Sequence, residues 1–116
     1  MTVNEKIIQA LTPLDIPVTA DFYGGGEEEY ITFNYADDRG DDFGDNAPLH
    51  AVAYMQIHYF APMEKNYLSI KKRIRKALFT TGFTYPDVTD ATLTGEGIRH
   101  LVFECNIENE SELLES

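Results

Sequence analysis

The residues of this sequence that could perform chemistry are one cysteine, three histidines and a dense group of aspartates. Cys105 is the only thiol, and it lies in the stretch FECNI with Phe103 and Ile107 at the same alternating positions. A reactive cysteine needs exposure and nearby positive charge, whereas this apolar alternation predicts a buried, unreactive side chain. A single cysteine also excludes an intramolecular disulfide and fits a reducing compartment.

The three histidines form no known metal or catalytic motif. His50 and His58 fall on the same alternating positions of one predicted strand, but the extended chain between them separates them by about 26 Å, so they cannot share a metal ion. His100 lies in the last predicted strand. The sequence contains no HExxH, CxxC or Ser-His-Asp spacing, and no carboxylates stand out as a buried pair. We therefore expect no catalytic residue, no metal site and no cofactor.

Five aspartates lie between positions 37 and 45, in the stretch DDRGDDFGDNAP from Asp37 to Pro48. A calcium-binding EF-hand loop needs carboxylates at alternating positions, glycine at the sixth and glutamate at the twelfth. Here the aspartates come in pairs, Arg39 interrupts them, and Pro48 stands at the twelfth position. The pattern predicts a solvated loop, with adventitious binding of a divalent ion as the alternative. Phe43 either folds back on the domain or docks into a partner.

Three consecutive glycines, Gly24 to Gly26, precede three glutamates, Glu27 to Glu29. A triple glycine could hold a phosphate group, but a P-loop continues with Gly-Lys-Ser/Thr and a helix. The glutamates found here instead would repel phosphate. The segment is therefore predicted to be the turn of a hairpin that joins strands at Val18–Tyr23 and Tyr30–Ala36.

Two amphipathic helices are predicted to support these segments. The first covers residues 2–12 and ends before Pro13, and its Thr2 and Glu5 fit a capping box. The second lies within Asn66–Gly82, with glycine where a helix C-cap belongs. Apolar residues recur at spacings of three and four along both segments, which is typical of helices that cover a sheet.

Strands are predicted for the remaining apolar segments. Leu49–Ala61 has its smoother apolar face at odd positions, a period of two that is typical of a strand covered on one side. Ile98–Ile107 alternates in the same way, and Phe83–Val88 is a short strand that Pro86 confines to an edge or a bulge. The order α-β-β-β-α-β-β predicts an α+β fold, with a mostly antiparallel sheet of about five strands and both helices on one face.

The length of the chain fits one domain, which we place at residues 1–107, followed by an acidic C-terminal tail at residues 108–116. The net charge of −11, from 9 basic and 20 acidic residues, argues against specific binding to nucleic acid and against binding to anionic membranes. No apolar run approaches the roughly 20 residues that span a bilayer, and the first residues do not form a signal segment. We expect a cytosolic protein, or part of a particle assembled in a cytosol.

Positive charge is concentrated in and just before the second helix. Six of the nine basic residues fall within twelve positions: Lys65, Lys71, Lys72, Arg73, Arg75 and Lys76. The simplest interpretation is a solvated outer helix face, and the alternatives are a contact with an acidic neighbouring subunit or with nucleic acid. A basic strip on an acidic body could also bind copies of the same chain through charge complementarity.

Four stretches carry a resemblance to a known family. They are NEKIIQAL with TPLDIPVTADFY, YITFNY before the acidic stretch, MQIHYFAPMEKNYLSIKKRIRKALFTTGF, and the closing RHLVFECNI. Together they resemble the small tail-completion proteins of long-tailed bacteriophages and prophages, which are the tail terminator or tail-to-head joining proteins. The resemblance covers positions 4 to 107, nearly the whole predicted domain.

The resemblance implies a structural protein with an α+β fold and no enzymatic activity. Family members typically act as rings of six at the head-proximal end of the tail, where they stop tail-tube growth and offer a surface to the head connector. The expected partners are therefore further copies of the chain, the tail-tube protein and the head connector protein. The expected location is the cytoplasm of the bacterial host during assembly, and then the virion tail.

Charge segregation suggests how copies would meet, because a ring needs two different surfaces in head-to-tail contact. The basic candidates are Lys71, Lys72, Arg75 and Lys76, and the acidic candidates are Asp37, Asp38, Asp41 and Asp42, with Phe43 beside them. The alternative function is that of a monomeric phage regulatory or anti-host protein that binds a host enzyme. An acidic protein can mimic DNA, but the basic strip argues against such a mimic.

Overall fold

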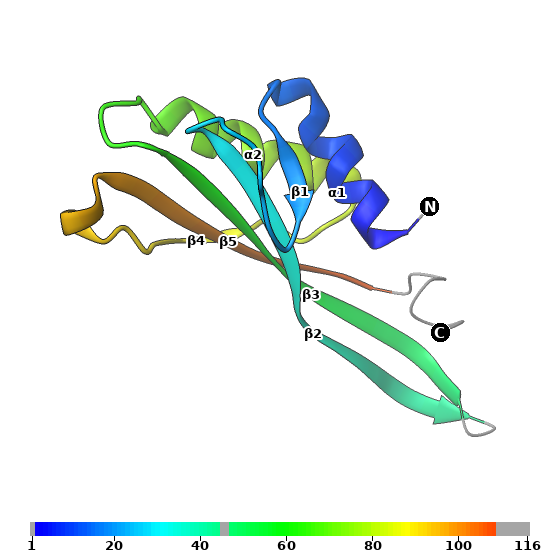
Figure 1. The fold of residues 1–116 in the computed structure, drawn as a ribbon. Helices are drawn as coiled ribbons and strands as arrows, with labels where there is room; N and C mark the ends of the chain where they lie inside the picture. The colour runs from blue at the N-terminus through cyan, green and yellow to red at the C-terminus, as the bar shows by residue number, and fades with distance from the viewer. Residues whose placement is uncertain (1, 45–46, 109–116) are drawn as a thin grey trace.

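The computed structural model describes residues 2–44 and 47–108, with the backbone alone for residues 37–44, 47–51 and 94. The chain folds into two α-helices and a five-stranded sheet, with an elongated shape of 54 × 27 × 26 Å. Figure 1 shows both helices on one face of the sheet and a two-stranded extension that projects beyond them. The predicted α+β class, with a mostly antiparallel sheet, is confirmed.

Helix α1 (Val3–Leu11) begins at the predicted capping box. The Thr2 hydroxyl accepts a hydrogen bond from the Glu5 N–H at 3.1 Å, and the Glu5 carboxylate accepts one from the Thr2 N–H at 3.2 Å. These bonds satisfy backbone donors that have no partner inside a helix, and they lower the pKa of Glu5. A 3₁₀ turn, η1 (Thr12–Leu14), follows where the helix was predicted to stop.

Helix α2 (Leu68–Thr81) ends at Gly82, as predicted. Gly82 has φ 116°, in the left-handed region that favours glycine, and the Phe83 N–H donates to the Leu78 carbonyl at 3.2 Å. The residues of the predicted apolar stripe that are buried are Ile70, Ile74 and Leu78. They hold α2 against the sheet and leave its basic residues on the outer surface.

The sheet has the strand order β1-β2-β3-β5-β4. Its centre is β3 (Ala47–Pro62), which pairs antiparallel with β2 (Tyr30–Gly44) on one side and with β5 (Ile98–Glu108) on the other. β4 (Asp87–Asp90) forms one edge of the sheet. β4 therefore starts later than the predicted strand at Phe83–Val88, after Pro86, because proline cannot donate to a ladder.

The predicted hairpin between Val18–Tyr23 and Tyr30–Ala36 is wrong. β1 (Val18–Ala20) is short and pairs with β2 in parallel, so residues 21–29 must carry the chain back to the end of the sheet where β1 began. The reversal starts at Asp21, which has φ 64°. Turn-forming residues between two apolar runs predict a hairpin, but they do not fix the direction in which the second strand returns.

The returning segment is fastened at its end. The Tyr59 hydroxyl donates a hydrogen bond to the Glu29 carboxylate at 2.6 Å, and Lys65 forms an ion pair with the same carboxylate at 3.3 Å. Burial first, and then the hydrogen bond and charge of Glu29, raise the pKa of Tyr59. Glu29, at the end of the glycine-glutamate segment, thus anchors this segment to β3 and to Lys65.

The acidic stretch from Asp37 to Pro48, predicted as a loop, is the second correction. Its described backbone belongs to β2 and β3, whose antiparallel pairing continues until Gly44 lies opposite Ala47. A register shift between Tyr35 and Asp37 marks the point where this extension begins. Aspartate and glycine are depleted in strands, which is why the composition favoured a loop, but a continuous backbone ladder overrides that preference.

We call residues 37–44 and 47–51 the arm. β1 pairs only with Ile31–Phe33 of β2, and β5 pairs with β3 only from Val52 onward. Residues 37–39 still pair with residues 52–54 of β3, which also pair with β5. Within the described part of the chain, residues 40–44 and 47–51 of the arm therefore form a two-stranded ribbon whose strands pair only with each other. Five extended residues would reach roughly 16 Å. Residues 45–46 at its tip lie outside the described residues.

The hydrophobic core lies between the helices and one face of the sheet. The odd-numbered positions of β3 and the odd-numbered positions 101–107 of β5 were predicted to point inward, and those with described side chains are buried: Ala53, Met55, Ile57, Tyr59, Ala61, Leu101, Phe103, Cys105 and Ile107. The predicted acidic tail at 108–116 begins at Glu108, the last residue of β5, and its remainder lies outside the described residues.

Candidate interaction surfaces

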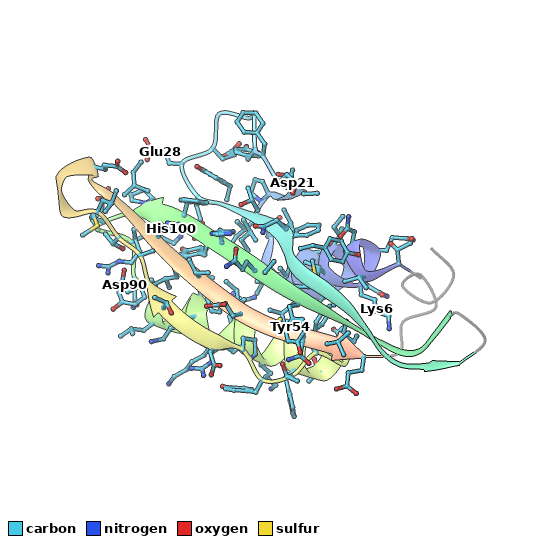
Figure 2. All side chains as sticks on the ribbon, turned by 90° about the horizontal axis from the view of Figure 1, so that it is seen from below. Lys6, Asp21, Glu28, Tyr54, Asp90 and His100 are labelled. Carbon is cyan, nitrogen blue, oxygen red and sulfur yellow. The ribbon has the colours of Figure 1, made fainter. Side chains whose placement is uncertain are left out.

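The open face of the sheet, which neither helix covers, carries a row of stacked rings. Figure 2 looks onto this face, where the His100 side chain lies on the strands. Tyr23 stacks on Tyr30 with centroids 4.7 Å apart, Tyr30 on Phe60 at 4.8 Å, and Phe60 on His100 at 4.4 Å. The row crosses β2, β3 and β5, and His58 continues it at 5.2 Å from His100.

The stacking determines what this row can bind. Proteins that bind single-stranded nucleic acid offer the free faces of aromatic side chains to the bases. Tyr30 and Phe60 each stack on two neighbouring rings instead, and the net charge of the chain is −11. The stacked rings cover part of the open face of the sheet.

Beside the row, a chain of hydrogen bonds links three strands. His58 Nε2 lies 3.0 Å from Asn34 Oδ1, and His58 Nδ1 lies 2.9 Å from His100 Nε2. Asn34 Nδ2 in turn donates to Gln56 Oε1 and to the Tyr35 carbonyl, both at 3.3 Å. The backbone carbonyl can only accept, so it fixes which end of the Asn34 amide donates.

The tautomers of both histidines follow from that orientation. Asn34 Oδ1 accepts, so His58 must carry its proton on Nε2 and accept at Nδ1 from the Nε2–H of His100. A first additional proton fits on Nδ1 of His100 without breaking either bond. A second would place two N–H groups against each other at 2.9 Å. The pair can therefore accept one proton but not two.

The pKa values of the pair follow this geometry. Burial lowers the pKa of His58, and the neighbouring His100 lowers it further. Burial also lowers the pKa of His100, while the charge of Asp90 opposes that change. Both side chains are accordingly neutral at pH 7. They act as a pair of hydrogen-bonding groups and do not supply positive charge to the open face.

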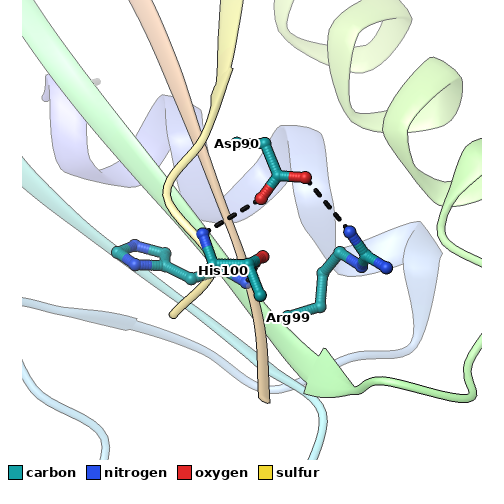
Figure 3. Close-up of polar contacts among 4 residues, drawn as sticks. Asp90, Arg99 and His100 are labelled. Carbon is teal, nitrogen blue, oxygen red and sulfur yellow. Dashed lines mark hydrogen bonds and ion pairs between the residues drawn. The ribbon is translucent and has the colours of Figure 1, made fainter. Parts of the chain in front are cut away.

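The turn between β4 and β5, which contains η2 (Thr94–Glu96), positions His100. The Asp90 carboxylate accepts hydrogen bonds from the Thr92 N–H at 3.0 Å and from Arg99 at 3.1 Å, and these contacts lower its pKa, with Thr92 the larger cause. The Thr92 hydroxyl then accepts a bond from the His100 N–H at 2.9 Å. Figure 3 shows Asp90 and Arg99 facing each other beside His100.

A second surface lies on α2. Lys72, Arg75, Lys76 and Phe79 are spaced i, i+3, i+4 and i+7, so they share one outer face of the helix, and Tyr85 lies against that face. We call these five residues the α2 flank. Phe79 and Tyr85 are 56% and 54% exposed, and their rings meet edge to face with their centroids 5.7 Å apart. Exposed aromatic and arginine side chains together are typical of protein–protein contacts.

The side chains of the candidate basic residues differ in their contacts and in their exposure. Arg75 donates to the Pro86 carbonyl at 3.0 Å, and its guanidinium lies 4.5 Å from the centre of the Tyr85 ring. The Lys71 ammonium lies 5.8 Å from the Tyr67 ring, whereas Lys72 and Lys76 are exposed. Arg75 is thus held in place inside its own chain, and the two lysines provide the more accessible charge.

The acidic candidates Asp37, Asp38, Asp41, Asp42 and Phe43 all lie on β2 within the arm. The structure therefore places them on one continuous element. Their side chains are outside the described part of the structure, so their pairing with the basic residues stays a prediction. The arm leaves the sheet beyond the helices, as Figure 1 shows, and does not lie along the basic surface of its own copy.

Among the chemical candidates with described side chains, Cys105, His58 and His100 contact other residues of the fold. Cys105 is 5% exposed, which confirms the predicted burial of its side chain, and burial raises the pKa of the thiol to about 12. Among the described side chains, no three His, Cys, Asp or Glu residues come close enough together to hold a metal ion. A hollow of about 430 Å³ beside Pro62 and Ile98 is lined by Glu27, Glu28 and Glu64, and its lining includes no histidine or cysteine.

The contact between His58 and His100 was not predicted from the sequence. Both occupy even positions of strands predicted to alternate, and two adjacent antiparallel strands can bring such positions together. In the observed register, Phe60 lies opposite His100 and His58 lies opposite Val102. This register places His58 and His100 diagonally across the two strands. The sequence contains the alternation but not this register.

No helix in the described part of the chain is both long and apolar enough to cross a membrane. Comparison with protein-family models and with curated proteins finds no match. Functional inference therefore starts from the surfaces described above and from the resemblance in the sequence.

Proposed function

We propose that this protein is a structural component of the head–tail joining region of a long-tailed phage or prophage. In this role it caps the tail tube as an oligomeric ring and joins the tube to the head connector. The resemblance across positions 4 to 107 and the α+β fold with both helices on one face support the proposal. Its partners are further copies of the chain, the tail-tube protein and the head connector protein.

The arm is the observation that carries the proposal furthest. A two-stranded ribbon without further cover is marginally stable in water at best. The described outer part of the arm, residues 40–44 and 47–51, pairs only with itself, and it projects from a body that has its own core. Such an element supports a protein whose final state includes neighbouring subunits. The protein assembles in the cytoplasm of the bacterial host and remains in the virion tail.

The proposal is tested by the growth of tail tubes in vitro. The tail-tube protein encoded in the same head–tail gene block is polymerised with and without this chain, and the tubes are measured by negative-stain microscopy. We expect shorter tubes with a ring at one end. Tubes of unchanged length with bare ends would overturn the proposal. Capture of a host enzyme by a monomeric chain would then favour the regulatory or anti-host alternative.

A further inference from the structure

The α2 flank is an apolar and basic surface that the described residues leave exposed. Phe79 and Tyr85 are more than half exposed, although each could bury a large apolar area. Arg75 is already oriented by the Pro86 carbonyl and the Tyr85 ring, so little side-chain freedom remains to be lost on binding. Oriented arginine beside exposed aromatic rings is the composition of an interface centre.

The charge of the flank selects an acidic partner. Lys72 and Lys76 are exposed two turns and one turn before Phe79 along the same helix face. The rest of the chain is strongly acidic, since the net charge is −11 even with these lysines included. The arm contributes Asp37, Asp38, Asp41 and Asp42 to that total on one strand. A second copy of the chain therefore already carries an element of the required charge.

We infer that the arm of one copy docks on the α2 flank of the next copy. This contact rests on the proposed function, because that function requires copies to assemble. The contact would cover one side of the ribbon with a helix, and it would bury the exposed side chains of Phe79 and Tyr85. The contact pairs acidic residues with basic ones across a partly desolvated surface, where complementary charges fix the register of docking.

A rival mode would pair the free edge of β2 with the edge strand β4 of a neighbour. Free strand edges commonly bind further strands. The charges on the two strands argue against this pairing. β4 begins and ends with an aspartate, Asp87 and Asp90, and the arm carries paired aspartates along β2. Like charges opposite each other destabilise a strand pair. Docking on the basic helix avoids this repulsion, so we favour it over strand addition.

The placement of the two surfaces fits a closed ring. The flank lies where α2 meets Pro86, next to edge strand β4, whereas the free edge of β2 faces the β1 side of the sheet. One copy thus offers two different surfaces on opposite sides of its sheet. Contacts between unlike surfaces propagate head to tail and can close into a ring.

Disulfide trapping between differently tagged copies tests the contact. One copy carries Asp41→Cys, and the other carries either Lys76→Cys on the flank or Thr89→Cys on β4. Native Cys105 is buried with a raised pKa and stays silent under mild oxidation. We expect a covalent heterodimer with Lys76→Cys and little with Thr89→Cys. The reverse preference, or no heterodimer in either mixture, would overturn the inference.

Charge reversal supplies a second measurement. Lys72→Glu with Lys76→Glu should weaken association by about tenfold or more, seen as a shift toward monomer in light scattering. Adding Asp41→Lys and Asp42→Lys should restore the larger mass. The control compares single substitutions: Arg73→Glu changes the net charge as much as Lys72→Glu but lies off the flank, so it should keep the assembly. If the flank variant still assembles and caps tubes, the inference fails while the proposed function survives.

Discussion

The two faces of the sheet are closed in different ways. On the helix-covered face, apolar side chains such as Ile57 and Phe103 are fully buried beneath α1 and α2. Neither α1 nor α2 covers the open face, where stacked rings and the His58–His100 pair take the place of a second layer. The covered face depends on volume and packing. The open face depends on the orientation of a few rings and hydrogen bonds.

This difference teaches where the molecule tolerates change. Filling a core is a matter of shape, so any lost volume there leaves a cavity. A row of rings at a solvent boundary loses less when one member is shortened, because water can enter the gap. On the open face, however, the direction of each hydrogen bond is critical. In the series His100, His58, Asn34 and Gln56, each side chain determines whether the next one donates or accepts.

The largest expected effect is on the covered face. Phe103→Ala should lower the free energy of unfolding by about 3–5 kcal/mol, because it leaves a cavity beneath the helices. Val102→Ala, the adjacent residue on the open face, is the matched control and should cost about 1 kcal/mol. Urea unfolding measures both. Equal losses at the two positions would contradict the distinction between the faces.

The next effect concerns the row of rings. Phe60 stacks on both Tyr30 and His100, so Phe60→Ala should lower the free energy of unfolding by about 2 kcal/mol. Phe60→Leu retains most of the apolar area but removes the stacking, and it should cost about 1 kcal/mol. Thermal unfolding at neutral pH measures the series. A leucine variant as stable as the native chain would show that the row contributes area alone.

A smaller effect distinguishes the faces by pH. The pKa values of His58 and His100 are lowered in the folded chain, so the unfolded chain takes up protons first as the pH falls. The stabilising contribution is complete above about pH 6.5 and is lost below it, by at most about 1.4 kcal/mol per pH unit for each histidine. His58→Gln with His100→Gln should flatten this part of the pH profile. An unchanged slope would assign the pH dependence to the carboxylates.

The smallest expected effect is an absence of reaction on the covered face. Burial raises the pKa of Cys105 to about 12, so the native thiol should not react with an aromatic disulfide reagent between pH 7 and 9. It should react fully once the protein is unfolded in urea. Phe103→Ala, which opens the core beside the same strand face, should accelerate labelling. Rapid labelling of the native chain would place the thiol at the surface.

Sequence patterns predicted the local structure well and the pairing poorly. The capping box at Thr2 and the glycine that ends α2 are short-range signals, and both are confirmed. The inward face of β3 was readable because one side of the strand is buried. The parallel return of β1 and the strand character of the arm depend on partners distant in sequence, so composition alone could not predict them.

In the candidate surfaces, too, some features could be predicted from the sequence and others required the tertiary structure. The basic run on α2 was visible in the sequence as charge, and the predicted burial of Cys105 is confirmed. Tyr85 joins Phe79 and that run only because the chain folds back after Gly82. The His58–His100 contact needed the register of β3 and β5. Side-chain clusters that come from tertiary structure leave little trace in a single sequence.

The length of β3 has a consequence for how the backbone exchanges hydrogen with solvent. Residues 52–62 of this strand lie between two paired neighbours, whereas residues 47–51 have a single described partner strand. Amide protons of residues 52–62 should exchange only when the whole domain unfolds, whereas those in the arm exchange through local opening. A single continuous strand would therefore contain both slowly and rapidly exchanging amides, and slower exchange at residues 47–51 would show that the arm is bound to its partner.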